Sequence, residues 1–259
     1  MEAAGQDTSE AAAKISYWNK RQDDFLQQTG FKRQQSREEI AGFTWKDQKA
    51  ASEQEKTRLD MIASFRAKMS AAGYKTEGFD TYYGDQETLD HMVGAFERMS
   101  NLYPDEAKDV WIRWAYDKDV TKYGWYDPAD GSIGFNQNAM GNWEDIRSQY
   151  ADLVKKLESP KGTDADAIFY HEFGHRVWYA RGGGSLKKSI DKVLFDMGFG
   201  RVGTNYRDEL LGQELCTYAA ERTRPSYQEA VAEAFAEWYN STNPRRFCET
   251  FLKEVGIIS

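Results

Sequence analysis

Apolar residues three or four positions apart predict helices along most of the chain. The pattern is clearest over 58–72 and 86–102, where apolar side chains return to one face with every turn. Similar patterns predict further helices at 142–158, 166–180, 186–197, 208–222, 226–240 and 244–254. Gly73 and the glycines at 182–184 follow two of these runs, as glycine often does at the end of a helix. The chain is therefore expected to be mostly helical.

One stretch alternates with a period of two instead. Apolar residues at every second position from Val110 to Tyr116 predict a strand, with a buried helix as the alternative. Two short runs of aromatic and apolar residues, 121–126 and 132–136, flank the segment Asp-Pro-Ala-Asp-Gly at 127–131, which is typical of a hairpin turn. The expected fold class is α+β, a mostly helical domain with a small sheet.

The N-terminal part differs in composition. Residues 1–13 are small and polar, and residues 14–57 are rich in Gln, Lys, Arg and Glu, with scattered aromatics that form no continuous stripe. We expect residues 1–73 to form a disordered tail and a helical arm, and residues 74–259 to form the folded domain. The aromatics of the arm are either incidental or a docking surface for a partner protein.

Charge is distributed unevenly. Residues 1–72 carry 12 basic and 11 acidic residues, whereas residues 73–259 carry 22 basic and 31 acidic residues. This acidic balance argues against a nucleic-acid-binding surface, and no apolar run approaches the length of about 20 residues that a transmembrane helix needs. The first residues do not resemble a signal peptide. We expect a cytoplasmic or virion-associated protein that binds neither nucleic acid nor membranes.

The strongest chemical signal is the segment His171-Glu-Phe-Gly-His175 in the helix predicted at 166–180. Residues four apart leave the same face of a helix, so the two imidazoles could hold one metal ion. Glu172 would then be able to take a proton from a water molecule beside the metal. Zn²⁺ suits such ligands because its tetrahedral site leaves one position open. The alternative is a buried polar network without a metal.

A third metal ligand must come from another element. The helix predicted at 226–240 carries Glu229, Glu233 and Glu237 four residues apart on one face, with apolar residues on the others. Either Glu229 or Glu233 could complete the site, and the spacing does not choose between them. The alternative is an acidic stripe on a surface helix.

These two segments together resemble a known family. Tyr170-His-Glu-Phe-Gly-His175, followed by Glu229-Ala-Val-Ala-Glu-Ala-Phe235, resembles the gluzincin peptidases related to anthrax lethal factor and the Pro-Pro endopeptidases. It is similar also to the zincin-like domains of phage minor head (MuF-type) proteins. The resemblance spans about residues 105–240 and is specific at the two helices.

The resemblance implies a role for each matching residue. His171, His175 and Glu229 would bind zinc, Glu172 would be the general base, and Glu233 would orient a ligand histidine. The family also has a tyrosine seven residues before the ligand glutamate, where this chain has Arg222 and so departs from the pattern. Tyr218, eleven residues before Glu229, is the candidate for the catalytic tyrosine, and Tyr227 is the alternative.

The resemblance also suggests how a substrate binds. Residues 132–136 correspond, in order along the chain, to the edge strand with which such peptidases align an extended peptide. The alternative is an ordinary solvent-facing strand.

The expected function is that of a zinc-dependent endopeptidase acting on a protein or peptide substrate. A structural protein of a phage virion is the alternative from another class. It would have an inactive or accessory zincin fold, and its N-terminal arm would bind a head protein or another partner. A toxin or effector that cleaves one host protein would have the same sequence features.

Overall fold

The structure is a computed structural model that describes residues 45–220 and 227–259. The chain divides into two compact units, Met1–Glu55 and Lys56–Ser259. Most of the first unit lies outside the described residues, as does the predicted tail. The helix α3 (Trp45–Ala71) begins in the first unit and ends in the second. The predicted boundary between arm and domain at residue 73 stays a prediction, and the structure groups residues 56–73 with the second unit.

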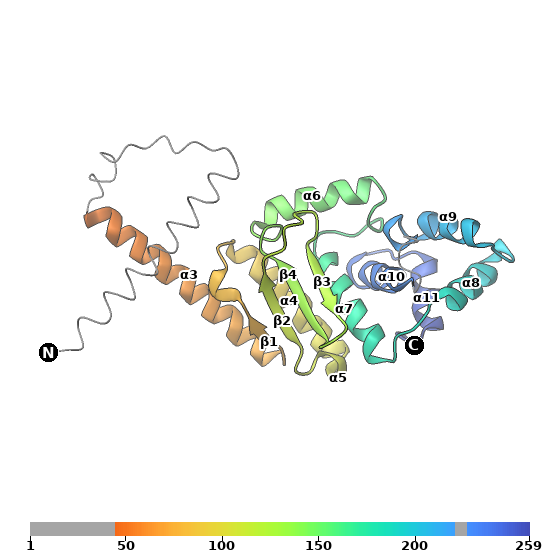
Figure 1. The fold of residues 1–259 in the computed structure, drawn as a ribbon, viewed down its shortest axis with the longest axis horizontal. Coiled ribbons are helices and arrows are strands. Elements are labelled where there is room, and N and C mark those ends of the chain that lie inside the picture. Colours follow the sequence, from red (N-terminus) through yellow and green to blue (C-terminus); the bar gives the residue numbers. More distant parts are fainter. Residues whose placement is uncertain (1–44, 221–226) are drawn as a thin grey trace. The chain divides into compact units, whose positions relative to one another are not determined.

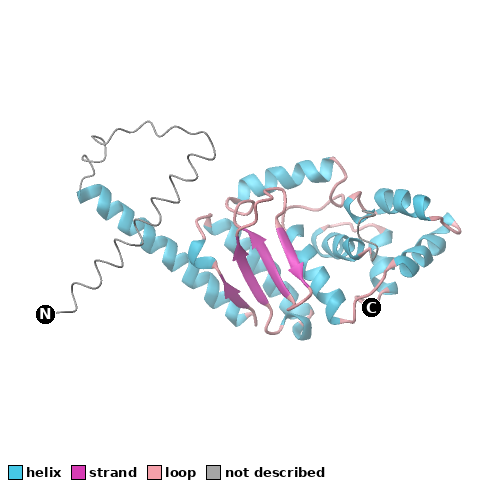
Figure 2. Cartoon of the chain, viewed as in Figure 1, coloured by secondary structure: helices cyan, strands magenta, loops and turns pink. Residues whose placement is uncertain are grey.

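The second unit combines helices with one four-stranded sheet, which confirms the α+β class (Figure 2). After α3, its elements are β1 (Lys75–Glu77), η1 (Phe79–Thr81), α4 (Gln86–Leu102), α5 (Pro104–Ala107), β2 (Trp111–Ala115), β3 (Gly124–Asp127), β4 (Ser132–Asn136), α6 (Trp143–Lys155), α7 (Ala167–Ala180), α8 (Lys187–Leu194), η2 (Phe195–Phe199), α9 (Thr204–Glu214), η3 (Tyr218–Ala220), α10 (Gln228–Asn240) and α11 (Arg246–Glu254). None of the helices in the described ranges is long and apolar enough to cross a membrane.

The sheet has the order β1-β2-β4-β3 (Figure 1). The β3–β4 hairpin is antiparallel, as predicted, and β4 pairs in parallel with β2 on its other side. The prediction that residues 132–136 form an edge strand is therefore wrong, and so is the alternative of a solvent-facing strand, because all five residues of β4 are buried. The strand at the edge beside β4 is β3.

A layer of aromatic side chains holds α4 and α7 against one face of the sheet. The ring of Phe135 on β4 lies 6.1 Å from that of Phe96 on α4 and 5.4 Å from that of Phe169 on α7, both edge to face. Asp85 caps α4 by accepting the N–H of Thr88 at 2.8 Å. α7 is thus fixed between the sheet and the C-terminal helices.

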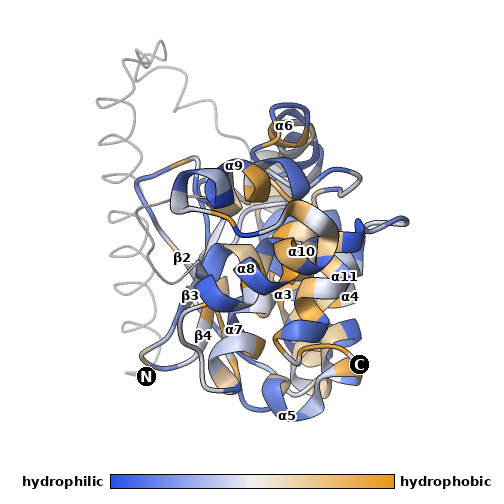
Figure 3. Ribbon diagram, turned by 90° about the vertical axis from the view of Figure 1, so that its right-hand side faces the viewer, coloured by the Kyte–Doolittle hydropathy of each residue, from blue (hydrophilic) through white to orange (hydrophobic). Residues whose placement is uncertain are grey.

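The helices α7 and α10 pack closely against each other. A Cβ atom added at Gly174 of α7 would lie 2.9 Å from Cβ of Phe235 and 3.1 Å from Cα of Ala232, both on α10. The apolar character of α10 is visible in Figure 3. Glycine on one helix and small residues on the other allow this approach, which brings the polar residues of both helices together.

The helix predicted at 208–222 has different bounds. α9 begins earlier, at Thr204, and ends at Glu214. Beyond it, the amide and the hydroxyl of Thr217 both donate hydrogen bonds to the carbonyl of Leu157, at 2.9 and 3.0 Å. These contacts with the turn after α6 divert the chain from α-helical geometry, so Tyr218 lies in the short 3₁₀ helix η3 rather than on an α-helix.

Candidate metal centre

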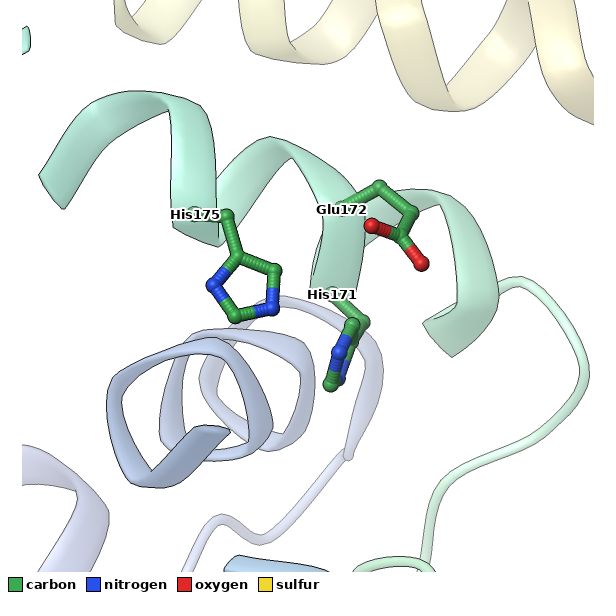
Figure 4. A group of neighbouring side chains, drawn as sticks. All are labelled: His171, Glu172 and His175. Carbon is green, nitrogen blue, oxygen red and sulfur yellow. The ribbon is translucent and has the colours of Figure 1, made fainter. Parts of the chain in front are cut away.

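His171, Glu172 and His175 on α7 form a group that could hold a metal ion. One potential ligand atom from each residue lies within 4.8 Å of the others, and among the described residues no other such group is found. The two imidazoles extend from α7 toward α10, while Glu172 points in a different direction (Figure 4). The sequence spacing predicted this geometry correctly.

Glu229 on α10 approaches both imidazoles from the opposite side. Its Oε2 atom lies 3.2 Å from Nε2 of His171 and 3.4 Å from Nε2 of His175. The carboxylate is buried, with 2% of the residue exposed. Two imidazole nitrogens and one carboxylate oxygen, from two helices, therefore meet at one point.

Glu233 contacts the other nitrogen of the first histidine. Its Oε1 atom lies 3.2 Å from Nδ1 of His171. A carboxylate in this position fixes the orientation of an imidazole and makes its other nitrogen a better ligand. Glu229 and Glu233 thus occupy different positions around His171, which the sequence spacing could not distinguish.

Glu237, the third glutamate of α10, is separate from the centre. It is fully buried and accepts hydrogen bonds from the guanidinium of Arg245, at 2.9 Å to Oε1 and 2.6 Å to Oε2. Since all three glutamates are buried, the alternative of an acidic surface stripe is wrong.

The buried charges alter the pKa values of the centre. Burial would lower the pKa of His171, but Glu233 and Glu229 raise it well above its usual value. Burial would raise the pKa of Glu229, yet its bonds to His171 and His175 hold it far below the usual range. The carboxylates therefore attract positive charge, which a bound cation could supply in place of protons.

Glu172 lies close to the edge strand. A Cβ atom added at Gly124 of β3 would be 3.1 Å from Cγ and from Oε1 of Glu172. A glycine at this position leaves room for the glutamate beneath the strand. Burial raises the pKa of Glu172, while the neighbouring histidines lower it and Glu229 raises it further.

The structure separates the two candidate tyrosines. The Tyr218 ring lies 6.1 Å from the ring of His171, and Tyr218 is partly exposed at the centre. The hydroxyl of Tyr227 instead donates a hydrogen bond to Oδ1 of Asp208 at 2.8 Å in a buried environment. Of the two, Tyr218 is the one whose side chain borders the space above His171 and Glu172.

Two cavities, of about 280 and 490 Å³, meet at the centre. Both are lined by Thr121, Lys122, Gly124, His171, Glu172 and Tyr218. The sequence analysis missed the loop that contributes Thr121 and Lys122. That loop is held by the buried Asn136, whose side-chain amide donates hydrogen bonds to the carbonyls of Asp119 and Lys122 at 2.8 and 3.0 Å. A single buried Asn at the end of a strand gives no periodic signal in the sequence.

Comparison with protein-family models, with curated proteins and with solved structures finds no match for this chain. The function must therefore follow from the chemistry of the centre.

Proposed function

We propose that this protein is a zinc-dependent endopeptidase in which His171, His175 and Glu229 hold the metal. The convergence of both Nε2 atoms on Oε2 of Glu229, at 3.2 and 3.4 Å, carries the proposal. Two imidazoles and one carboxylate are a ligand set typical of catalytic zinc, and they leave a coordination position open. Glu233, on the far nitrogen of His171, supports the same assignment.

The residues around the metal would share the chemistry of peptide hydrolysis. Zinc, when bound, would acidify a water molecule and polarise the scissile carbonyl. Glu172 would accept the proton of that water and later deliver it to the leaving amine, and its raised pKa suits this exchange. The phenol of Tyr218 would donate a hydrogen bond to the oxyanion.

The free edge of β3 supports a peptide as the substrate. The N–H of Asn136 donates to the carbonyl of Tyr123 at 2.9 Å, and Trp125 pairs with Gly134. In an antiparallel pair, residues that bond to the partner strand alternate with residues that do not. The main-chain groups of Gly124 and Tyr126 are therefore directed away from β4, toward the free edge, where an extended peptide could pair with them.

Metal analysis combined with peptide cleavage tests the proposal. The wild-type protein should bind one zinc ion per chain and cleave members of a degenerate peptide library. Glu172→Gln should keep the zinc and lose at least about a hundredfold in turnover, because it removes only the general base. His171→Ala should lose the zinc. Failure of the wild-type protein to take up zinc, or equal turnover by Glu172→Gln, would refute the proposal.

One further outcome would favour a different class. Zinc binding by the wild-type protein and by Glu172→Gln, with cleavage by neither, would indicate an inactive zincin fold. Arg222 at the position where the family has tyrosine is the observation that favours this alternative. A structural role, such as that of a phage head component bound to its partners through the N-terminal arm, would then be the better proposal.

A further inference from the structure

The smaller cavity extends from the metal centre into a space between α6 and α7. It reaches from His171 and Glu172 to Leu153 and Glu158 near the end of α6. Its apolar and aromatic walls are formed by Tyr123, Tyr150, Leu153, Ala167 and Ile168. A side chain that enters from the centre would therefore pass along partly apolar surface before it reaches the acidic end.

Glu158 is the charged group at that far end. It is exposed, and no lysine or arginine of the described residues forms an ion pair with its carboxylate. Of the charged residues nearer the centre, Glu233 contacts His171, the amine of Lys122 lies 3.3 Å from Oδ2 of Asp117, and Glu172 is the proposed general base at the mouth of the cavity. At the end of the cavity away from the metal centre, Glu158 is thus the carboxylate that is available to a ligand.

The main chain holds Glu158 in a defined position. Leu157 has a positive φ of 61°, which is disfavoured for a leucine, and the N–H of Glu158 donates to the carbonyl of Leu153 at 3.0 Å. Thr217 donates two hydrogen bonds to the carbonyl of Leu157 and so ties this turn to the segment that carries Tyr218. The turn after α6 is therefore a wall of the cavity that main-chain hydrogen bonds hold in place.

We infer that this cavity is a subsite for a lysine or arginine side chain of the peptide substrate, next to the scissile bond. Such a side chain can lay its aliphatic stem along the apolar walls while its cationic end reaches Glu158. The position of the subsite next to a scissile bond rests on the proposed function, but binding of a side chain in the cavity can be measured without cleavage.

A binding experiment tests the subsite by itself. Two degenerate heptapeptide libraries, with lysine or norleucine at the central position, are applied to immobilised, zinc-loaded Glu172→Gln protein, and retained peptides are quantified by mass spectrometry. Norleucine has a similar aliphatic stem without the charge. We expect about fivefold stronger retention of the lysine library, the effect of an exposed ion pair, and a smaller ratio at high salt.

Charge variants at the far end make the test specific. Glu158→Gln, combined with Glu172→Gln, should abolish the preference for lysine. Glu158→Lys in the same protein should give a preference for a third library with central glutamate. Glu97→Lys, an equal charge change at an exposed position of α4, should leave the lysine preference intact. Equal retention of both libraries, retention of neither, or a lysine preference that survives Glu158→Lys would overturn the inference.

Cleavage by the wild-type protein separates the two proposals. Cleavage without enrichment of lysine or arginine beside the cut bond would refute the subsite and leave the peptidase proposal standing. Conversely, a lysine preference in binding that depends on Glu158, with no cleavage of any peptide, would support the subsite and refute the peptidase proposal.

Discussion

Replacement of Gly174 by alanine tests whether the contact between α7 and α10 sets the metal centre. The added Cβ would lie 2.9 Å from Cβ of Phe235 and 3.1 Å from Cα of Ala232. Carbon atoms prefer separations of about 3.5–4.0 Å, so the helices must move apart by roughly 0.5–1 Å. Both clashing atoms belong to the rigid part of α10, so a side-chain rotation cannot relieve the contact.

Two opposing effects determine the change in stability. Overpacking of a core costs about 1–3 kcal/mol, whereas alanine is favoured over glycine within a helix by about 1 kcal/mol. We expect the free energy of unfolding of Gly174→Ala to fall by about 0–2 kcal/mol. In a unit of this size, each kcal/mol corresponds to about 2–4 °C, so the melting temperature should fall by up to about 8 °C.

The effect on the metal should be larger than the effect on the fold. The histidines lie on α7 and Glu229 lies on α10, so a shift of the helices changes the distance between these ligands directly. Metal sites tolerate deviations of only about 0.2 Å in ligand distance. We therefore expect zinc affinity, measured by competition with a chelating dye, to fall at least about tenfold.

The matched control is Gly94→Ala in α4. No atom lies within 4 Å of a Cβ added there, and the position is exposed. This variant should gain up to about 1 kcal/mol in stability and bind zinc as the wild-type protein does. If Gly174→Ala matched the wild-type protein in zinc affinity, or gained as much stability as Gly94→Ala, the role assigned to this helix contact would be wrong.

Four further predictions concern the buried charges and the metal. Arg245→Met should cost about 3–5 kcal/mol in urea unfolding because it leaves the carboxyl group of Glu237 buried without its ion-pair partner. Adding Glu237→Met should restore most of the loss, and a small effect of the single variant would contradict this. Chelation of zinc should lower the free energy of unfolding by about 2.7 kcal/mol relative to protein with zinc at a hundredfold excess over its Kd, and an unchanged melting temperature after chelation would contradict a specific site. Glu233→Gln should weaken zinc binding about 10- to 100-fold. Hydrogen bonds donated to Asp85 outweigh its burial and lower its pKa. The carboxylate should therefore contribute about 1 kcal/mol to the free energy of unfolding above its unfolded pKa of about 3.9, and this contribution should be lost as the pH falls through the folded pKa. Melting curves of Asp85→Asn should lack this acid-induced loss.

The helical part of the site could be predicted from the sequence because its information is local. Residues four apart on one helix share a face whatever surrounds the helix, so His171 and His175 were certain to be neighbours once α7 formed. The roles of Glu229 and Glu233 depend instead on how α10 is positioned against α7. That position is set at Gly174 by contacts between residues nearly 60 positions apart in the chain, which spacing alone does not encode.

The sheet illustrates the same limit. Local alternation and the turn at 127–131 predicted the β3–β4 hairpin, because both strands and their connection are contiguous. The strand order was not predictable in this way. β2 inserts beside β4 through a parallel pairing of Ile112 with Ile133. The alternation Ser-Ile-Gly-Phe-Asn of β4 is typical of a strand with one solvent-facing side, although all five residues are buried. β3 therefore forms the edge of the sheet beside β4, next to Glu172.

The helix α10 carries one glutamate in an ion pair away from the candidate metal centre and two glutamates at the centre. Its three glutamates have the same spacing and all are buried, and Glu237 forms an ion pair with Arg245, which is always protonated. Glu229 and Glu233 face imidazoles, which are neutral ligands for a metal or weak cations without one. A fold that needed only buried ion pairs would be served as well by arginine at all three positions. Histidine opposite Glu229 and Glu233 allows a metal ion to take the place of the imidazole protons, which arginine would not allow. Zinc should therefore stabilise the wild-type protein but not Glu229→Gln, whereas Glu237→Gln should destabilise the fold and still respond to zinc.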